Sequence, residues 1–149
     1  VALFSLFVWQ IASAKPAPVY SVSTFDPKRD AVEDLAMSVE KAKEGEKHVL
    51  VLAGGDWCAY CFIIDRIFKS DPDLATILAE NFLIMKVNYS DDNWNTPFFE
   101  MVPDFEDFPH FFVFDSSGEL VKSTSPESFR RPLGYDRTAL KIYLEGFLK

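Results

Sequence analysis

Metal-binding residues are scarce in this sequence, which has two cysteines and two histidines among its 149 residues. A structural zinc site takes about four such ligands, whereas this chain offers one cysteine pair and two histidines, His48 and His110, that are far apart in sequence. The ligand count therefore argues against a metal site. Hydrophobic residues make up 48% of the chain, which is enough apolar material for the packed core of one domain.

Basic residues are also in the minority, with 15 Lys and Arg against 23 Asp and Glu and a net charge of −8. Nucleic acids and anionic membranes are bound by basic surfaces, so we expect neither as a partner. An acidic surface is compatible with basic or neutral protein partners, although solubility explains the charge equally well.

The apolar run at the N-terminus, VALFSLFVWQIASA (residues 1–14), falls short of the length that crosses a membrane, which is about 20 residues. It ends in Ala12-Ser13-Ala14, a small-x-small pattern typical of a signal-peptidase site. We expect residues 1–14 to be a signal peptide, N-terminally incomplete because Met and a basic segment are missing. A clipped membrane anchor and a core helix are the alternatives. The favoured prediction is an exported protein, periplasmic or secreted, with no stable membrane insertion after signal cleavage.

The remaining sequence predicts a linker over 15–29 and one domain over 30–149. The linker is rich in Pro and Ser and includes a short edge strand near 19–22. Asp30 is expected to cap the first helix of the domain, which ends at Gly45.

The domain alternates helices and strands. Apolar runs at 48–53 and 82–88 are typical of strands buried on both faces of a sheet. A third strand at 110–114, a turn at 115–118 and a returning strand at 119–124 form a hairpin. This order predicts an α/β fold, a mixed central β-sheet flanked by helices on both faces. Helices are expected at 58–69 and around 94–101, and two more are expected to begin after the N-cap residues Asp71, which is followed by Pro72, and Asp136.

Both cysteines lie in one motif, GGDWCAYCF (residues 54–62), between a buried strand and the start of a helix. Free N–H groups and the helix dipole at such a position stabilise a thiolate. Cys58, in the first turn, is expected to be the exposed nucleophile, and Cys61 is one turn further along the same side. A disulfide that closes so short a loop removes little entropy from the unfolded chain, so the spacing favours thiol–disulfide exchange over structural reinforcement.

The motif Trp57-Cys58-Ala59-Tyr60-Cys61 after a buried strand resembles the active site of the thioredoxin superfamily. Phe108-Pro109-His110, before a strand and hairpin, resembles the cis-proline loop of that superfamily. The resemblance covers roughly residues 30–149 and is closest to exported bacterial thioredoxin-like proteins. It implies a thioredoxin-like fold and thiol–disulfide oxidoreductase activity.

The resemblance also implies residue roles. Cys58 resembles the attacking thiolate and Cys61 the buried resolving thiol. Trp57 resembles the aromatic residue beside the disulfide, and Pro109 the cis-proline that faces it. The backbone of Phe108 would then pair with an extended substrate segment, as in strand addition.

Two positions depart from the family pattern. Many thioredoxins carry a buried carboxylate six residues before the first cysteine, where this chain has Leu52. Asp56 is nearer but expected on the loop surface, so the proton acceptor for Cys61 stays open. The dipeptide between the cysteines ends in Tyr60, expected to support the site. It contains no histidine, which disfavours strong thiolate stabilisation and favours a reductase over a strong oxidant.

Other residues near the motif have open interpretations. His110 is expected to be a packed or hydrogen-bonded residue, the alternative being a group that tunes the Cys58 thiolate. The acidic cluster before Pro109 is expected to be a solvated loop. A further hypothesis is that it disfavours the Cys58 thiolate and anionic thiols such as glutathione. That cluster comprises Asp104, Glu106 and Asp107. The aromatics before it, Trp94, Phe98 and Phe99, are expected in the core, the alternative being that they line a substrate surface.

Together these patterns predict a disulfide oxidoreductase that exchanges its Cys58/Cys61 dithiol with protein disulfides and needs no cofactor. Its expected partners are protein disulfide substrates and an upstream thiol–disulfide redox partner. The alternative is a redox-inactive thioredoxin-like module that binds or chaperones a client protein. Retention of both cysteines at catalytic spacing favours exchange.

Overall fold

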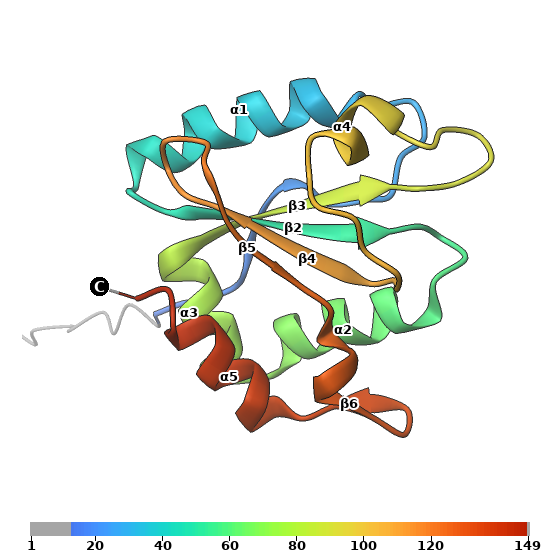
Figure 1. The fold of residues 1–149 in the computed structure, drawn as a ribbon. Coiled ribbons are helices and arrows are strands. Elements are labelled where there is room, and N and C mark those ends of the chain that lie inside the picture. Colours follow the sequence, from blue (N-terminus) through green and yellow to red (C-terminus); the bar gives the residue numbers. More distant parts are fainter. Residues whose placement is uncertain (1–12, 149) are drawn as a thin grey trace, which may run out of the picture.

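The computed structural model describes residues 13–148 (Figure 1). All but the last two residues of the predicted signal peptide lie outside this range. No helix within residues 13–148 has the length and apolar character needed to cross a membrane.

A five-stranded sheet in the order β1-β3-β2-β4-β5 forms the centre of the fold. The neighbours β1, β3 and β2 run parallel, whereas β4 is antiparallel to both β2 and β5. The mixed sheet predicted from the alternation of elements is therefore confirmed. The strands are β1 (Val19–Val22), β2 (His48–Gly54), β3 (Phe82–Asn88), β4 (His110–Phe114) and β5 (Leu120–Thr124).

Helices cover both faces of this sheet (Figure 1). Helices α1 (Ala31–Glu44) and α4 (Thr96–Glu100) lie on one face. Helices α2 (Ala59–Ser70), α3 (Pro72–Asn81) and α5 (Arg137–Glu145) lie on the other. The predicted helices are confirmed to within a few residues at their ends.

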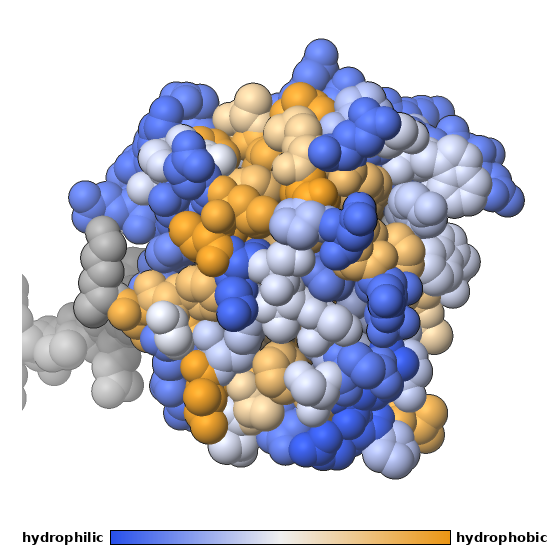
Figure 2. All heavy atoms as spheres, in the orientation of Figure 1, coloured by the Kyte–Doolittle hydropathy of each residue, from blue (hydrophilic) through white to orange (hydrophobic). Residues whose placement is uncertain are grey.

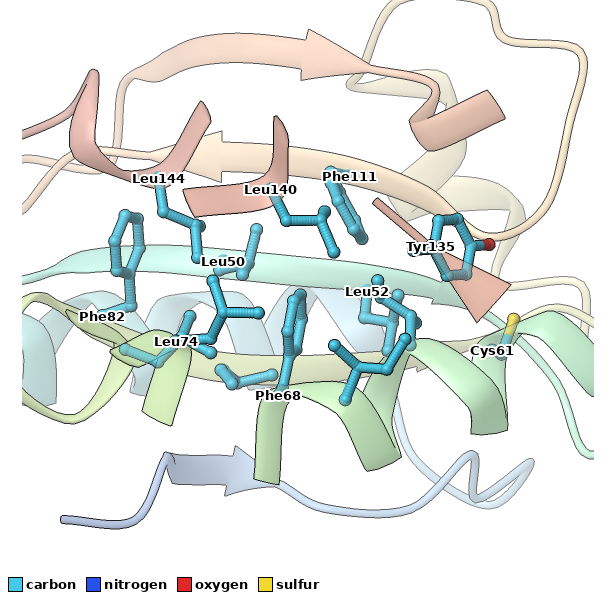
Figure 3. Close-up of a cluster of buried hydrophobic side chains, with 14 of the residues drawn as sticks. Leu50, Leu52, Cys61, Phe68, Leu74, Phe82, Phe111, Tyr135, Leu140 and Leu144 are labelled. Carbon is cyan, nitrogen blue, oxygen red and sulfur yellow. The ribbon is translucent and has the colours of Figure 1, made fainter. Parts of the chain in front are cut away.

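Each face of the sheet has its own hydrophobic core because β2, β3 and β4 are buried on both sides. Val49, Val51 and Phe112 pack toward α1, whereas Leu50, Leu52 and Phe111 pack toward α2, α3 and α5. Figure 3 shows this second cluster, with Cys61 at one end of it. The cysteine pair is thus anchored in the larger core of the domain.

The edge strand predicted near 19–22 is confirmed as β1, which pairs with β3. Phe25, three residues after it, is 3% exposed, so part of the segment predicted as a linker packs with the domain. The Pro-rich loop before the last helix forms a 3₁₀ turn (Pro126–Phe129) and a small hairpin. Its strands are β6 (Arg130–Arg131) and β7 (Gly134–Tyr135).

Candidate active site

Cys58 and Cys61 form a disulfide at the N-terminus of α2, with their Cα atoms 5.3 Å apart. Cys58 is the N-cap residue, so the helix begins one residue later than expected. Its Sγ accepts a hydrogen bond from the backbone N–H of Cys61 at 3.2 Å. A backbone N–H group at the N-terminus of the helix thus points at the sulfur expected to be the nucleophile. Such a donor favours the thiolate form of that sulfur.

The two cysteines differ in accessibility less than the sequence indicates. Cys58 is 4% exposed and Cys61 is fully buried, so Cys58 is the more accessible but is itself largely covered. The oxidised pair belongs to the core cluster against α2, which explains the low exposure of both residues. The Cys61 Sγ lies 3.9 Å from the carbonyl oxygen of Ala53, which can accept a hydrogen bond from the Cys61 thiol after reduction.

Both glycines of the GGDWC motif lie where a neighbouring side chain is too close to the backbone for a Cβ atom to fit. A Cβ on Gly54 would overlap Cys61 Sγ, and a Cβ on Gly55 would overlap the indole Nε1 of Trp57. The glycines therefore allow the second sulfur and the tryptophan ring to approach the backbone at the end of β2.

Trp57 lies beside the cis-proline loop and is 57% exposed. The ring packs edge-on against Phe108, with centroids 5.3 Å apart. The Phe108–Pro109 peptide bond is cis, as the family resemblance implies. Phe108 in turn stacks on Tyr89 at 4.9 Å. The loops after β2, after β3 and before β4 thus meet in one aromatic cluster.

Tyr60, between the cysteines, faces the β6–β7 hairpin on the other side of the disulfide loop. Its ring packs edge-on against Tyr135 at 5.9 Å, and the guanidinium of Arg130 lies over it at 4.2 Å. Arg130 also forms an ion pair with Glu127 at 2.8 Å, which offsets its charge. Burial raises the pKa of Tyr135 to about 12, so this tyrosine is neutral under ordinary conditions.

His110 is a packed residue, as expected, and its surroundings do not support the alternative of a group that tunes the Cys58 thiolate. It is 5% exposed, and its ring contacts Phe105 and Phe112 at 4.8 and 4.7 Å. Its Nε2 lies 2.8 Å from the Ser123 hydroxyl. Burial lowers the pKa of His110 to about 4, against a smaller raising effect of Asp107, so the imidazole is neutral near pH 7.

Leu52 is fully buried, so the position of the family carboxylate is apolar. In the sheet it pairs with Lys86 of β3, whose ammonium group is bound by Asp65 of α2 at 3.1 Å. Asp65 also accepts a hydrogen bond from the Tyr20 hydroxyl at 2.6 Å. A buried carboxylate is therefore present one helical turn after Cys61, although its charge is compensated by a buried lysine.

The three acidic residues before Pro109 are exposed, as predicted for a solvated loop. Phe105, between them, packs against Phe108 at 5.1 Å, which places the loop beside the aromatic cluster. Within residues 13–148, His, Cys, Asp and Glu form no group of three or more suited to a metal ion.

Sequence reasoning did not assign Tyr89 to the site, and it favoured the core for Trp94 over the alternative of a substrate surface. Trp94 is instead 45% exposed and packs on Tyr89 at 4.7 Å, whereas Phe98 is buried as expected. Tyr89 directly follows β3, and the carboxyl ends of neighbouring parallel strands share one edge of a sheet. That positional signal could have linked Tyr89 to the GGDWC loop after β2.

This arrangement is a thioredoxin fold with its cysteine pair at the strand-to-helix junction and a cis-proline loop packed on the neighbouring tryptophan. The profile of a protein family described as thioredoxin-like matches residues 30–116, and the chain belongs to that family. Comparison with curated proteins gives no match.

Solved structures show the same fold at low sequence identity. A disulphide isomerase from Xylella fastidiosa Temecula1 is 16% identical, with a TM-score of 0.69 over 84% of this chain and 96% of its own. A DsbH oxidoreductase is 15% identical, with a TM-score of 0.54 over 88% of this chain and 85% of its own. A mutant thioredoxin from Halobacterium salinarum NRC-1 is 21% identical, with a TM-score of 0.52 over 92% of this chain and 96% of its own.

Proposed function

We propose that this protein is a thiol–disulfide oxidoreductase that reduces protein disulfides with the Cys58/Cys61 pair. The observation that carries the exchange activity, whatever its direction, is the hydrogen bond from the Cys61 N–H to Cys58 Sγ at the start of α2. A donor that points at this sulfur stabilises the thiolate, which is the reactive form in exchange.

The proposed reaction has two exchange steps. The Cys58 thiolate attacks one sulfur of the substrate disulfide, so that a mixed disulfide forms and the other substrate sulfur leaves as a thiolate. The Cys61 thiolate then attacks Cys58 Sγ, restores the Cys58–Cys61 disulfide and releases the second substrate thiolate. The substrate gains two electrons and, from solvent, two protons. An upstream thiol–disulfide partner must supply two electrons to regenerate the dithiol.

The charges around the pair support the reducing direction. The loops beside Trp57 carry Asp56, Asp91, Asp92 and the acidic cluster before Pro109, and negative charge disfavours a thiolate. His110 is neutral, and the charge of Arg130 is offset by Glu127. A less stabilised reduced form has a lower reduction potential.

We further propose that the protein acts outside the cytosol, in the periplasm or after secretion. The support is the apolar, uncharged segment of residues 1–14 with its small-x-small end. Exported compartments permit stable disulfides in substrate proteins.

The test is a redox titration of the full chain in defined dithiol buffers, with free thiols trapped and counted. We expect a reversible two-electron couple in the lower half of the range from about −270 to about −120 mV. Cys61→Ser should accumulate a mixed disulfide with a disulfide-bonded substrate protein, and Cys58→Ser should not. A pair without a reversible couple would contradict the proposal and favour the binding module, whereas a potential near −120 mV would contradict the reducing direction.

A further inference from the structure

An open groove with a volume of about 440 Å³ lies directly beside the disulfide loop. Trp57 forms one wall, and the loop between β3 and α4 forms the other. In Figure 1 both loops lie at the right edge of the molecule, and Figure 2 shows mainly blue and pale residues at the upper right, where the loop after β3 lies. The groove is lined by Trp57, Tyr89, Ser90, Asp91, Asp92 and Trp94.

The two indole rings of the groove are exposed yet held in place. The Nε1–H of Trp57 donates to the carbonyl oxygen of Tyr89 at 2.7 Å, and Trp94 packs edge-on against the Tyr89 ring at 4.7 Å. Their exposed fractions are 57% and 45%. Exposed, fixed aromatic rings are typical of binding surfaces because little side-chain entropy is lost on contact.

The charge of the groove is entirely negative. Residues 89–109, which form its outer wall and the loop before Pro109, contain six acidic residues and no Lys or Arg. Asp91 and Asp92 are exposed, and neither forms an ion pair with another residue of the described chain. Elsewhere many acidic side chains are paired, namely Asp34, Glu40, Asp65, Asp71, Asp73, Glu127 and Asp136.

We propose that this groove docks a substrate segment carrying Lys or Arg next to the disulfide that Cys58 attacks. A cation that enters the groove would lie over an indole face, which is the best aromatic partner for a cation. It would also meet two carboxylates that form no ion pair within the described chain. The inference rests on the proposed function, because it names the class of substrate that the same site reduces.

The position of the groove beside the cysteine pair explains why a preference for basic segments would affect the rate of disulfide exchange. Trp57 precedes Cys58 in sequence and packs on Phe108, whose loop carries the cis-proline. A segment in the groove therefore continues directly toward the cysteine pair. Uncharged or acidic segments would lack the cation–π contact, and acidic ones would meet repulsion from Asp91 and Asp92.

The test measures single-turnover reduction of three short peptides by the pre-reduced full chain. Each peptide is closed by one disulfide, and the three differ only in two flanking residues, which are Lys, Glu or Gln. We expect the second-order rate constant to be about tenfold higher for the Lys than for the Glu peptide at low ionic strength. This ratio should approach unity near 1 M salt, where screening extends over about 3 Å.

Two double variants, which change the net charge equally, show whether the preference for the Lys peptide comes from the groove. Asp91→Asn/Asp92→Asn should reduce the Lys-to-Glu ratio to about twofold. Glu80→Gln/Glu145→Gln, exposed residues on α3 and α5, should leave it unchanged. The ratio cancels any general change in thiol reactivity. Equal rates for the three peptides, a preference for the Glu peptide, or equal ratios in both variants would each overturn the docking proposal.

A binding measurement separates this inference from the proposed function. Disulfide-free versions of the Lys and Glu peptides, with Ser in place of Cys, are titrated into the protein. Their binding is followed by the change in tryptophan fluorescence. Tighter binding of the Lys peptide, lost in Asp91→Asn/Asp92→Asn, supports docking even when no disulfide is reduced. Reduction of all peptides without preferential binding leaves the oxidoreductase proposal standing and refutes docking of basic segments.

Discussion

The indole Nε1 of Trp57 donates a hydrogen bond to the main-chain carbonyl oxygen of Tyr89, 2.7 Å away. The bond joins the loop that carries the cysteines to the loop that follows β3. It holds the tryptophan ring against the groove wall while more than half of that side chain remains exposed. A side chain from the redox motif is thus fixed by a residue 32 positions later.

Removal of this donor should have a measurable cost. We expect Trp57→Phe to lower the free energy of unfolding by about 0.5–1 kcal/mol, because a partly exposed hydrogen bond is lost while the ring contact with Phe108 is retained. Trp94→Phe is the matched control, since no indole hydrogen bond of Trp94 to another residue of 13–148 is present. Urea unfolding of both variants gives the comparison, and equal losses would refute a contribution from the Trp57 bond.

Gly54 should control the balance between the oxidised and reduced forms. In Gly54→Ala the new Cβ overlaps Cys61 Sγ in the disulfide, and such overpacking costs about 1–3 kcal/mol. After reduction the Cys61 side chain can rotate away, so the oxidised form is destabilised more. We expect the reduction potential to rise by about 20–60 mV.

The same redox titration checks this expectation. Gly134→Ala serves as the control because a Cβ there has no heavy atom within 4 Å. A potential unchanged in Gly54→Ala would show that the backbone moves to accommodate the methyl group.

His110 should make stability depend on pH. Its pKa is lowered to about 4 by burial, whereas the unfolded chain binds the proton at about 6.5. The unfolded state therefore holds more protons between these values, and stability should fall as the pH drops from about 6.5 to 4. The full effect is about 3 kcal/mol.

Urea unfolding at pH 7 and pH 4.5 measures this effect. His110→Phe should show a smaller loss of stability on acidification than the unaltered protein. Ser123→Ala removes the hydroxyl at Nε2 but keeps the imidazole, so it should retain the original pH dependence. Identical pH dependence in His110→Phe and the unaltered protein would rule out this histidine as the source.

Asp65 should be a major contributor to stability, since its carboxylate neutralises Lys86, whose side chain is 5% exposed. Asp65→Asn leaves that ammonium group buried without a counter-charge, and we expect a loss of about 3–5 kcal/mol. Lys69→Met removes a half-exposed partner of the same carboxylate and should cost less than about 1 kcal/mol. In Asp65→Asn/Lys86→Met both charges are absent, so this double variant should be more stable than Asp65→Asn alone, as measured by denaturant unfolding.

The acidic loop before Pro109 should slow reactions with anionic thiols. Neutralisation of Asp104, Glu106 and Asp107 to the corresponding amides should raise the rate of disulfide reduction by glutathione about two- to threefold at low salt. A neutral thiol such as 2-mercaptoethanol is the control reagent and should respond less. Equal acceleration with both thiols would show that the loop does not act through repulsion.

The sequence by itself determined the features that rest on local interactions. N-caps were predicted at Asp30, Asp71 and Asp136, and each carboxylate accepts backbone N–H groups two or three residues further along. Such bonds need no distant partner, so residue type and spacing suffice. The apolar runs likewise predict buried strands, because only a central strand is covered on both faces.

The position of the cysteine pair was also determined locally. A strand, two glycines and a helix start place Cys58 and Cys61 together at the helix N-terminus, as the structure confirms. The cis bond before Pro109 came from the family resemblance and not from spacing, and it is confirmed as well.

Only the tertiary structure decided which distant residues complete the site. Trp94 faces solvent beside Trp57 rather than the core, because the loop after β3 is held against the GGDWC loop. His110 is buried within β4, where it pairs with Ala53 of β2. These contacts join residues that lie tens of positions apart, so they depend on how the strands are ordered in the sheet. The spacing of residues along the sequence predicts local hydrogen bonds and periodic burial. The groove and its negative charge form only where three loops meet at one edge of the fold.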